Sequence, residues 1–306
     1  MMADCVCPIN SGPPFYESLA ICITALNRDI SKHSNNIPMD PDSVSADLQD
    51  VQEIDYFADY LRFVDSVPQF RAIKERSFEA MALKEGSSVL DAGCGIGLDT
   101  CRMGARTGKS GKVIGLDSNE SMVSFAEKNR PPNLENVSFI RGDLLTLNFP
   151  DNFFDAIHIE RTLEHLEDPK PALKNLFRVL KQGGTIVIVE PDFETATPDP
   201  GDRDATRSLV SYCADNVGDG WIGRKMYGLM RETGFEVRIE VEPVILYDYP
   251  TFSRIGVMDK FVPGAVKAGV ITQNESDLLI EGWKQAGETG NFFWSMMMFR
   301  AIGKKL

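Results

Sequence analysis

Several apolar runs in this chain end in an acidic side chain, and three glycines follow the first of these runs. The run Val89–Leu90 ends in Asp91, and Gly93, Gly95 and Gly97 come directly after it. Glycine lets the backbone turn sharply and leaves room for a ligand against the main chain. The helix predicted to follow would add free N–H groups at its N-terminus. The pattern predicts a strand, a tight turn and a helix, with a ligand bound at the turn.

The spacing of the glycines distinguishes a dinucleotide-binding loop and a phosphate-binding P-loop from other glycine-rich turns. A dinucleotide fingerprint requires G-x-G-x-x-G, and Leu98 occupies the place of its third glycine. The chain has no G-x-x-x-x-G-K-[ST] run, so a phosphate-binding P-loop is excluded. An ordinary turn between a strand and a helix is the alternative for the loop taken alone. A nicotinamide oxidoreductase is retained as a weaker alternative.

Asp117 ends a second apolar run, residues 112–117, about 20 residues beyond the glycine loop. An acid at this place can accept hydrogen bonds from both hydroxyls of a ribose. The alternative is that Asp117 caps the helix predicted over residues 121–129, a role for which Ser118 competes. We favour the ribose role.

Three further apolar runs, residues 136–143, 153–160 and 185–190, complete a predicted set of five strands separated by helices. This alternation predicts a doubly wound parallel sheet. Ligands bind at the carboxyl ends of such strands. These ends carry Asp91, Asp117, Asp143, Glu160 and Glu190. Asp143 is expected to accept a hydrogen bond from an adenine amino group.

The rest of the chain suggests a division into four parts. They are an arm or linker over 1–50 with a short helix at 15–30, a core over 51–246, a helical cap over 247–291 and a last strand over 292–306. The aromatic stretch 54–63 is either a helix packed on the core or a lid over the ligand, and the sequence favours neither. Residues Met296–Met298 are expected to fill the core.

Composition limits the classes of partner. The formal net charge of -13 would repel a phosphate backbone, so nucleic acid is not expected as a partner. Six cysteines without a C-x-x-C pair and only three histidines make a zinc site improbable. We interpret the thiols as reduced and the protein as cytoplasmic. No signal peptide or membrane span is apparent, and the oligomeric state is open.

The segments from Val89 to Glu190 resemble the class I S-adenosylmethionine (SAM) methyltransferases, and most closely the ubiquinone/menaquinone-biosynthesis branch (methyltransferase type 11) with its small-molecule relatives. The resemblance rests on LDAGCGIGLDT, VIGLDSNESMVSFA, VSFIRGDLLTLNFPDNFFDAIHIERTLEHLEDP and LFRVLKQGGTIVIVEPDF. It covers about 100 residues, with four motifs in the family's order and spacing. It implies a Rossmann-like, seven-stranded, mostly parallel sheet with an antiparallel last strand, expected at 292–302.

The resemblance also implies roles for individual residues toward SAM. The implied cofactor-binding residues are Asp91, Gly93, Gly95 and Gly97 for the methionine part, Asp117 with Ser118 for the ribose, Met122, Gly142, Asp143 and Leu144 for the adenine, and Glu160 beside the amino-acid moiety. Arg161 is implied to lie beside both that moiety and the substrate.

Three residues are candidates for acting on the methyl acceptor. His165 follows the fourth strand and is the leading general base, although a structural role in the LEHLEDP turn is slightly favoured. Tyr212 and Tyr249 are expected to bind the substrate. The N/D-P-P-Y/F motif and the metal ligands of catechol-type enzymes are missing. We therefore expect metal-independent transfer to a small molecule, with O, N or C acceptor unresolved. A SAM-binding protein without catalysis is the alternative of a different class.

Overall fold

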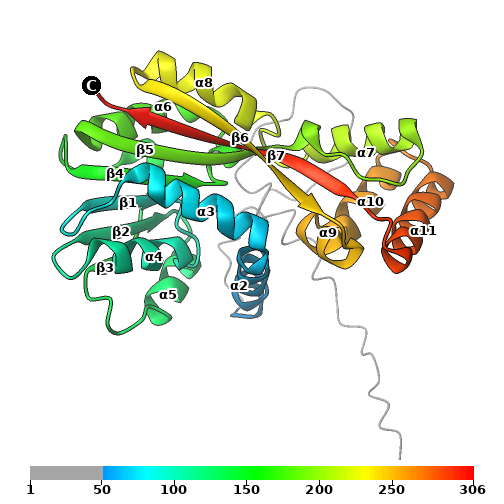
Figure 1. Cartoon of the computed structure of the whole chain (residues 1–306), viewed down its shortest axis with the longest axis horizontal. Helices are drawn as coiled ribbons and strands as arrows, with labels where there is room; N and C mark the ends of the chain where they lie inside the picture. Colours follow the sequence, from blue (N-terminus) through cyan, green and yellow to red (C-terminus); the bar gives the residue numbers. More distant parts are fainter. Residues whose placement is uncertain (1–50) are drawn as a thin grey trace, which may run out of the picture.

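The structure is a computed structural model that describes residues 51–306, without the side chains of residues 51–53. The predicted arm over 1–50 and its helix at 15–30 lie outside this range. A single sheet crosses the molecule in the order β3-β2-β1-β4-β5-β7-β6 (Figure 1). Its strands are β1 (Ser88–Ala92), β2 (Lys112–Asp117), β3 (Val137–Arg141), β4 (Phe154–Glu160), β5 (Leu180–Asp192), β6 (Glu236–Leu246) and β7 (Trp294–Lys304).

The strand directions agree with the predicted topology. Strands β1 to β5 pair in parallel, whereas β7 runs antiparallel to both of its neighbours, β5 and β6. The predicted Rossmann-like sheet with a reversed last strand is therefore confirmed. Two boundaries differ from those expected. Strand β5 begins at Leu180 and continues through Gly183 and Gly184, because this end pairs with the carboxyl end of β7. Strand β7 begins at Trp294 rather than at Phe292.

Helices cover both faces of the sheet and also extend past its end. In the described part of the chain they are α2 (Val51–Ser66), α3 (Pro68–Met81), α4 (Leu98–Thr107), α5 (Glu120–Lys128), α6 (Pro169–Val179), α7 (Arg203–Asp215), α8 (Ile222–Thr233), α9 (Tyr249–Ile255), α10 (Met258–Lys267) and α11 (Gln273–Thr289). None of these helices has the length and apolar character needed to cross a bilayer.

The side chains of each strand alternate between the two faces of the sheet, and each face has its own hydrophobic cluster. Val89 packs in the cluster that includes Phe70 and Met103, from α3 and α4, whereas the adjacent Leu90 packs with Leu173 from α6 on the opposite face. Successive side chains of a strand point to opposite faces, so a strand covered by helices on both sides must be apolar throughout. This is why the acids of the parallel strands β1 to β5 lie near the ends of the strands.

The segment 247–291 forms the helices α9, α10 and α11 between β6 and β7. The long strands β6 and β7 extend beyond the rest of the sheet, and these helices lie at their far end with α7 (Figure 1). Trp283 of α11 is fully buried and packs edge-on against Phe252 of α9. We call the four helices α7, α9, α10 and α11 the cap. The domain boundaries at residues 246 and 292 stay a prediction.

Candidate functional site

A cavity of about 890 Å³ opens at the carboxyl ends of β1, β2 and β4 and continues between the core and the cap. One part is lined by the loops after these strands, and another by α2 and the cap. Tyr60 of α2 donates a hydrogen bond from its hydroxyl to the carbonyl of Ile255 in α9, at 3.0 Å. Phe57, Tyr60 and Leu61 line the cavity, so this stretch of α2 covers the ligand space as well as packing on the core.

The glycine loop follows β1 in a conformation that excludes larger side chains. Gly93 has φ +81°, and a Cβ there would lie 2.2 Å from Oγ1 of Thr162. Gly97 has φ +79°, and a Cβ there would lie 2.4 Å from Cζ of Phe139. Both positions need glycine for the backbone as well as for space. Gly93 and Gly95 line the cavity, but Gly97 is placed behind the loop, where it packs against β3.

Asp117 links the glycine loop to the end of β2. One carboxylate oxygen, Oδ2, accepts a hydrogen bond from the Gly95 amide at 2.9 Å, and Oδ1 accepts one from the Asn119 amide at 2.9 Å. The cap of α5 is Asn119, which accepts from the amides of Ser121 and Met122, so neither Asp117 nor Ser118 has the capping role considered from the sequence. Burial raises the pKa of Asp117. Asp117 and Ser118 line the cavity together with Met122.

Asp91 lies buried beneath the glycine loop with both oxygens engaged. Oδ2 accepts a hydrogen bond from the Thr100 hydroxyl at 2.5 Å, and Oδ1 lies 2.9 Å from Nδ1 of His158. Burial opposes the charged form of His158, but Asp91 outweighs it and the pKa of His158 is raised. Asp91 therefore ties β1 to α4 and β4 and fixes the base of the loop. Thr100 and His158 were not found from the sequence, because no motif marks them.

The loop after β3 forms one end of the cavity. Asp143 accepts a hydrogen bond from the Leu145 amide at 2.8 Å and caps a short 3-10 helix, Leu144–Thr146. Leu144 is buried, whereas Asp143 is exposed at the cavity rim. Gly142 lies between them and β3, and a Cβ there would approach Leu116 to 2.8 Å. The three residues predicted at this end, Gly142, Asp143 and Leu144, all line the cavity.

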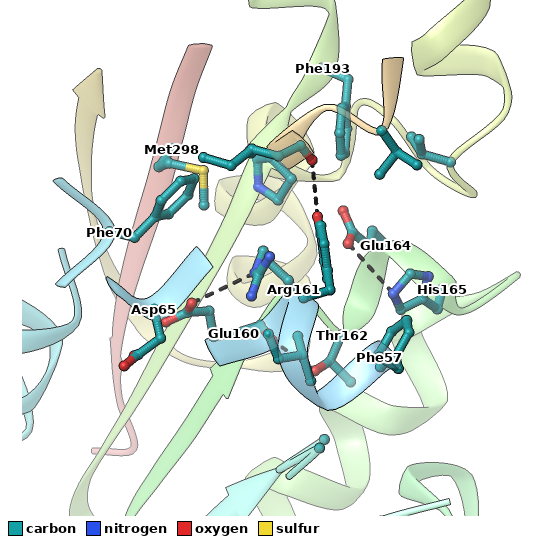
Figure 2. A pocket seen from close by; sticks show the side chains of 18 of the residues that line it. Phe57, Asp65, Phe70, Glu160, Arg161, Thr162, Glu164, His165, Phe193 and Met298 are labelled. Atoms are coloured by element: carbon teal, nitrogen blue, oxygen red, sulfur yellow. Dashed lines mark hydrogen bonds and ion pairs between the residues drawn. The ribbon is translucent and has the colours of Figure 1, made fainter. Parts of the chain in front are cut away.

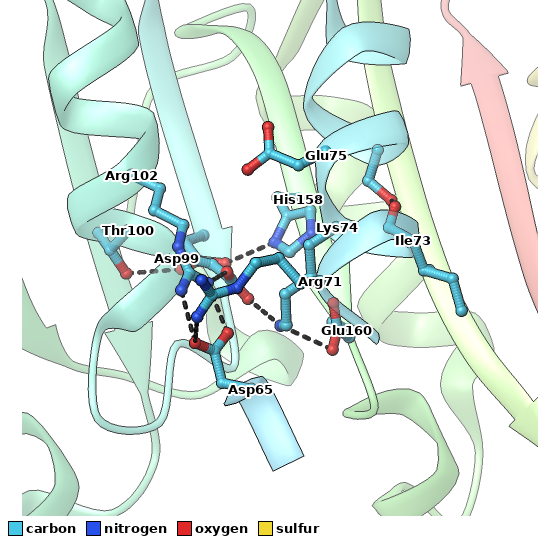
Figure 3. A network of polar contacts seen from close by, with 12 residues as sticks. Asp65, Arg71, Ile73, Lys74, Glu75, Asp99, Thr100, Arg102, His158 and Glu160 are labelled. Carbon is cyan, nitrogen blue, oxygen red and sulfur yellow. Dashed lines mark hydrogen bonds and ion pairs between the residues drawn. The ribbon is translucent and has the colours of Figure 1, made fainter. Parts of the chain in front are cut away.

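A charged network connects α2 and α3 to the loop side of the sheet (Figure 3). Nζ of Lys74 lies 2.7 Å from Oε1 of Glu160 and also contacts Asp99. Arg102 contacts Asp99 at 2.9 Å and forms two contacts with Asp65 of α2. Burial opposes the charge on Lys74, but Asp99 and Glu160 outweigh it and raise the pKa of Lys74. Lys74 lowers the pKa of Asp99 in turn, in spite of burial. The network ties Glu160 at the cavity wall to Lys74 of α3.

Arg161 lies at the centre of the polar side of the cavity (Figure 2). Its φ of +50° is unusual for a residue with a side chain, and its amide is held by the carbonyl of Val189 at 2.9 Å. Its Nε lies 3.7 Å from Oε1 of Glu160. Figure 2 shows Arg161 between Glu160 and Glu164, so its side chain faces both carboxylates.

Glu164 and His165 follow on the short 3-10 helix Leu163–His165, with Glu164 Oε1 at 3.5 Å from His165 Nε2. Burial raises the pKa of Glu164 to about 7, with Arg161 acting in the opposite sense. Burial and then Arg161 lower the pKa of His165 to about 4. At neutral pH the imidazole is neutral and only weakly basic, whereas the carboxyl titrates near that pH. The electrostatics favour Glu164 over His165 as a base.

Glu190 supports this turn from β5. Its Oε1 accepts hydrogen bonds from the amides of Thr162 and Leu163, at 3.0 and 2.7 Å. Its side chain is fully buried, and burial together with Glu164 raises its pKa well above the ordinary value. Glu190 does not line the cavity, so it holds the turn that carries Glu164 rather than reaching a ligand.

Comparison with known proteins agrees with this arrangement. The sequence model of a family described as "Methyltransferase domain" matches residues 83–234, which contain the glycine loop, Asp117 and the Glu160–His165 turn. The chain belongs to the class I SAM-dependent methyltransferases. It is an enzyme of this class and its cofactor is SAM. This assignment decides against the nicotinamide oxidoreductase considered from the sequence.

Relatives of this methyltransferase extend the similarity in different ways. An uncharacterised 37.1 kDa protein in transposon TN4556 of Streptomyces fradiae is 30% identical over 247 residues, which are 80% of this chain and 70% of that protein. Demethylmenaquinone methyltransferase of Staphylococcus carnosus is 37% identical over 139 residues, 45% of this chain, and the match spans only 57% of that relative. The YcgJ protein of Bacillus subtilis shares the fold, with a TM-score of 0.54 and 18% identity over 76% of this chain and 97% of that one.

Two predicted substrate residues of the methyltransferase lie away from the cavity. The hydroxyl of Tyr212 packs at Gly264 of α10, and α7 instead turns Leu209, Val210 and Cys213 toward the cavity. The ring of Tyr249 packs against Phe252 and Phe292, outside the cavity wall. Tyr212 and Tyr249 do not line this cavity, because the packing of the cap decides which helix faces are turned inward, and their role in binding the substrate stays a prediction.

The structure also brings to the site residues that the sequence did not single out. Lys74, Glu164 and Trp283 line the cavity from α3, the turn after β4, and α11. Met296 and Met298, expected as core residues alone, are buried and also line the cavity (Figure 2 for Met298). The period-two pattern of β7 places both on one face, but the sequence does not indicate that this face meets a cavity.

Proposed function

We propose that this methyltransferase transfers a methyl group to a small-molecule acceptor enclosed between its core and its cap. The observation that carries the proposal is the continuity of one cavity from the glycine loop to the cap helices, with Glu164 and His165 lining it. A substrate space that is closed by α2 and the cap suits a small molecule better than a macromolecule. The net charge of -13 also disfavours nucleic acid, and the free thiols of Cys94, Cys101 and Cys213 are consistent with the cytoplasm.

The residues at the loop end fit the parts of SAM. Asp117 would accept hydrogen bonds from the ribose hydroxyls, beside Ser118, and Met122 and Leu144 would pack against the adenine, with Asp143 at its amino group. These side chains supply acceptors and apolar contacts at the same end of the cavity. The amides of the glycine loop, the one at Gly95 being oriented by Asp117, border the same space.

The methionine part of SAM carries both an ammonium and a carboxylate, and the cavity wall offers both complementary charges. Among the described residues, Oε2 of Glu160 and Nε of Arg161 are buried without a hydrogen-bond partner. A buried polar atom without a partner costs free energy, which a ligand can recover. Glu160 would accept from the ammonium and Arg161 would donate to the carboxylate. Asp91 would act indirectly, by fixing the loop.

SAM, when bound, supplies a methyl group that its sulfonium already makes electrophilic. The chain then has to hold the acceptor in line with this methyl group and keep water out. Where the acceptor is a hydroxyl, an ammonium or an acidic carbon, a base must also take up its proton. We assign this role to Glu164, whose pKa of about 7 lies near the working pH, and give His165 the role of positioning the carboxylate. Within residues 51–306 no group of acidic, histidine or cysteine side chains is arranged to hold a metal ion.

The proposal is tested first by calorimetric titration with SAM and S-adenosylhomocysteine, and then by transfer of a labelled methyl group to a panel of small molecules. Micromolar binding of both sulfur ligands with turnover of at least one acceptor is the expected result. Turnover on a protein or nucleic-acid substrate alone would overturn the small-molecule proposal. Binding without turnover on any acceptor would favour the non-catalytic alternative.

A further inference from the structure

The residues that line the cavity differ in polarity between the first and the second half of the described chain. Its charged lining residues all come from positions up to His165, on α2, α3, α4, strands β1 to β4 and the loops after these strands. From Pro191 onward, the lining residues within the described chain are apolar side chains, Gly256 and Cys213, with no charged, hydroxyl or amide side chain among them. We call this second part, walled by the cap with β7 and the loop after β5, the acceptor chamber. Phe193, Leu209, Phe252 and Met298 are typical of its wall.

One side chain of this apolar wall carries a buried polar atom without a partner. Trp283 of α11 is fully buried and lines the chamber, and its Nε1–H has no hydrogen-bond partner among the described residues. Buried tryptophan N–H groups usually find a partner, because leaving a donor unpaired costs free energy. An indole nitrogen can only donate. The missing partner must therefore be an acceptor atom, such as an oxygen of a bound molecule.

We infer that the methyl acceptor is an uncharged, mainly apolar molecule with a hydrogen-bond-accepting oxygen, a carbonyl or an ether, that binds the indole N–H of Trp283. An ionised group in the chamber would lose its hydration without gaining a counter-charge, so charged acceptors are disfavoured. Any charge that the acceptor develops must lie at the other end, beside Arg161 and Glu164. This inference rests on the proposed small-molecule function and specifies its substrate class.

The size of the cavity agrees with two occupants. Its volume of about 890 Å³ lies toward the upper end of the range for small-molecule sites, so it has room for an acceptor next to the cofactor. Trp283 and Trp294 both line the cavity, and they are two of the three tryptophans of the chain. Intrinsic fluorescence therefore reports occupation of the chamber, with the exposed Trp221 as the remaining source.

The test uses the full chain saturated with S-adenosylhomocysteine, so that probes cannot enter the cofactor end. Four naphthalene probes are compared by fluorescence and calorimetry: 2-acetylnaphthalene as a neutral ketone, 2-isopropenylnaphthalene as a hydrocarbon of similar shape, and 2-naphthoate and 2-naphthylmethylammonium as ions. We expect the ketone to bind at least about tenfold more tightly than either ion. We expect it to exceed the hydrocarbon by about fivefold, owing to the bond from Trp283.

The substitution Trp283→Phe removes the N–H and should bring the ratio of ketone to hydrocarbon affinity close to one. Trp221→Phe, the same change at an exposed tryptophan outside the cavity, should leave the ratio unchanged. Ketone and hydrocarbon binding equally to the unmodified protein would overturn the role of Trp283 even if Trp283→Phe does not fold. Equal binding of the ions would overturn the uncharged class. Failure to bind S-adenosylhomocysteine would instead count against the proposed function.

Discussion

Glu164 Oε1 lies 3.5 Å from His165 Nε2, on one turn of 3-10 helix that lines the cavity. The two groups have pKa values displaced in opposite directions, to about 7 for the carboxyl and to about 4 for the imidazole. Burial disfavours the charged form of each, and Arg161 stabilises a carboxylate while it destabilises an imidazolium. One environment thus strengthens the first group as a base and weakens the second.

Replacing Glu164 should therefore cost more activity than replacing His165. We expect Glu164→Gln to lower kcat at least about 100-fold, because the amide cannot take up a proton. His165→Gln should lower kcat by less than about tenfold, since it removes a neutral neighbour of the carboxylate. Steady-state kinetics with an identified acceptor and calorimetry with S-adenosylhomocysteine separate catalysis from cofactor binding. A larger loss for His165→Gln would return the role of base to the imidazole.

The activity of the unmodified enzyme should rise with pH through the region around 7. Glu164 has to be deprotonated to accept a proton, so kcat falls below its pKa and reaches a plateau above it. The groups facing Glu164 include Arg161, His165 and Glu190, and the inflection belongs to this set as a whole. A kcat profile over pH 5 to 9 measures it. An identical profile for Glu164→Gln would show that another group is responsible.

Ionisation of Glu164 should lower the stability of the folded protein although it raises the activity. The pKa of Glu164 is raised from its ordinary 4.5 to about 7 in the folded protein, so the unfolded chain ionises first as the pH rises. The stabilising contribution of the protonated carboxyl is therefore fully present below about pH 4.5 and is lost by about pH 7. Glu164→Gln should raise Tm relative to the parent at pH 8 by a few degrees, and by less at pH 4.5. Calorimetric scans of both proteins at pH 8 and pH 4.5 measure this difference. The same Tm difference at the two pH values would contradict the prediction.

Asp117→Ala should weaken binding of S-adenosylhomocysteine at least about 100-fold. It removes two prospective charge-assisted hydrogen bonds to the ribose, each of which contributes about 1.5–3 kcal/mol, and the bond that orients the Gly95 amide. The matched control is Asp155→Ala, because Asp155 also accepts a backbone N–H, from Ser88, but does not line the cavity. Calorimetric titration of both variants is the measurement. Comparable losses in the two would mean that Asp117 acts only through the fold.

Lys74→Met should destabilise the fold by about 3 kcal/mol, since it removes the buried ammonium between Asp99 and Glu160 and leaves Arg102 and Arg161 as their remaining counter-charges. Lys170→Met removes a lysine from an exposed pair with Glu232 and should have no measurable effect. Urea unfolding of the two variants compares them directly. The prediction would be wrong if both variants unfolded at the same urea concentration as the parent.

Local patterns in the sequence determined most of the sheet and the positions of the residues at its carboxyl edge. The glycine loop, Asp117 and Asp143 each follow an apolar run directly, and parallel strands place their carboxyl ends at one edge of the sheet. A strand and the residue after it are fixed by neighbouring residues, so these positions could be predicted without knowing what packs around them. The last strand was also predicted from the chain itself, but its reversed direction came from the family resemblance.

Tertiary packing alone decided the acceptor side. Residues Tyr212 and Leu209 lie on the same helix, and only the seating of α7 against α10 turns Leu209 inward and Tyr212 away. Lys74 and Glu160 meet although they are distant in the chain. The displaced pKa values of Glu164 and His165 depend on burial and on Arg161, which the identities of the two residues do not reveal. Solvent exclusion and long-range contacts arise only once the chain has folded, which is why the chemistry of the acceptor could be inferred only from the structure.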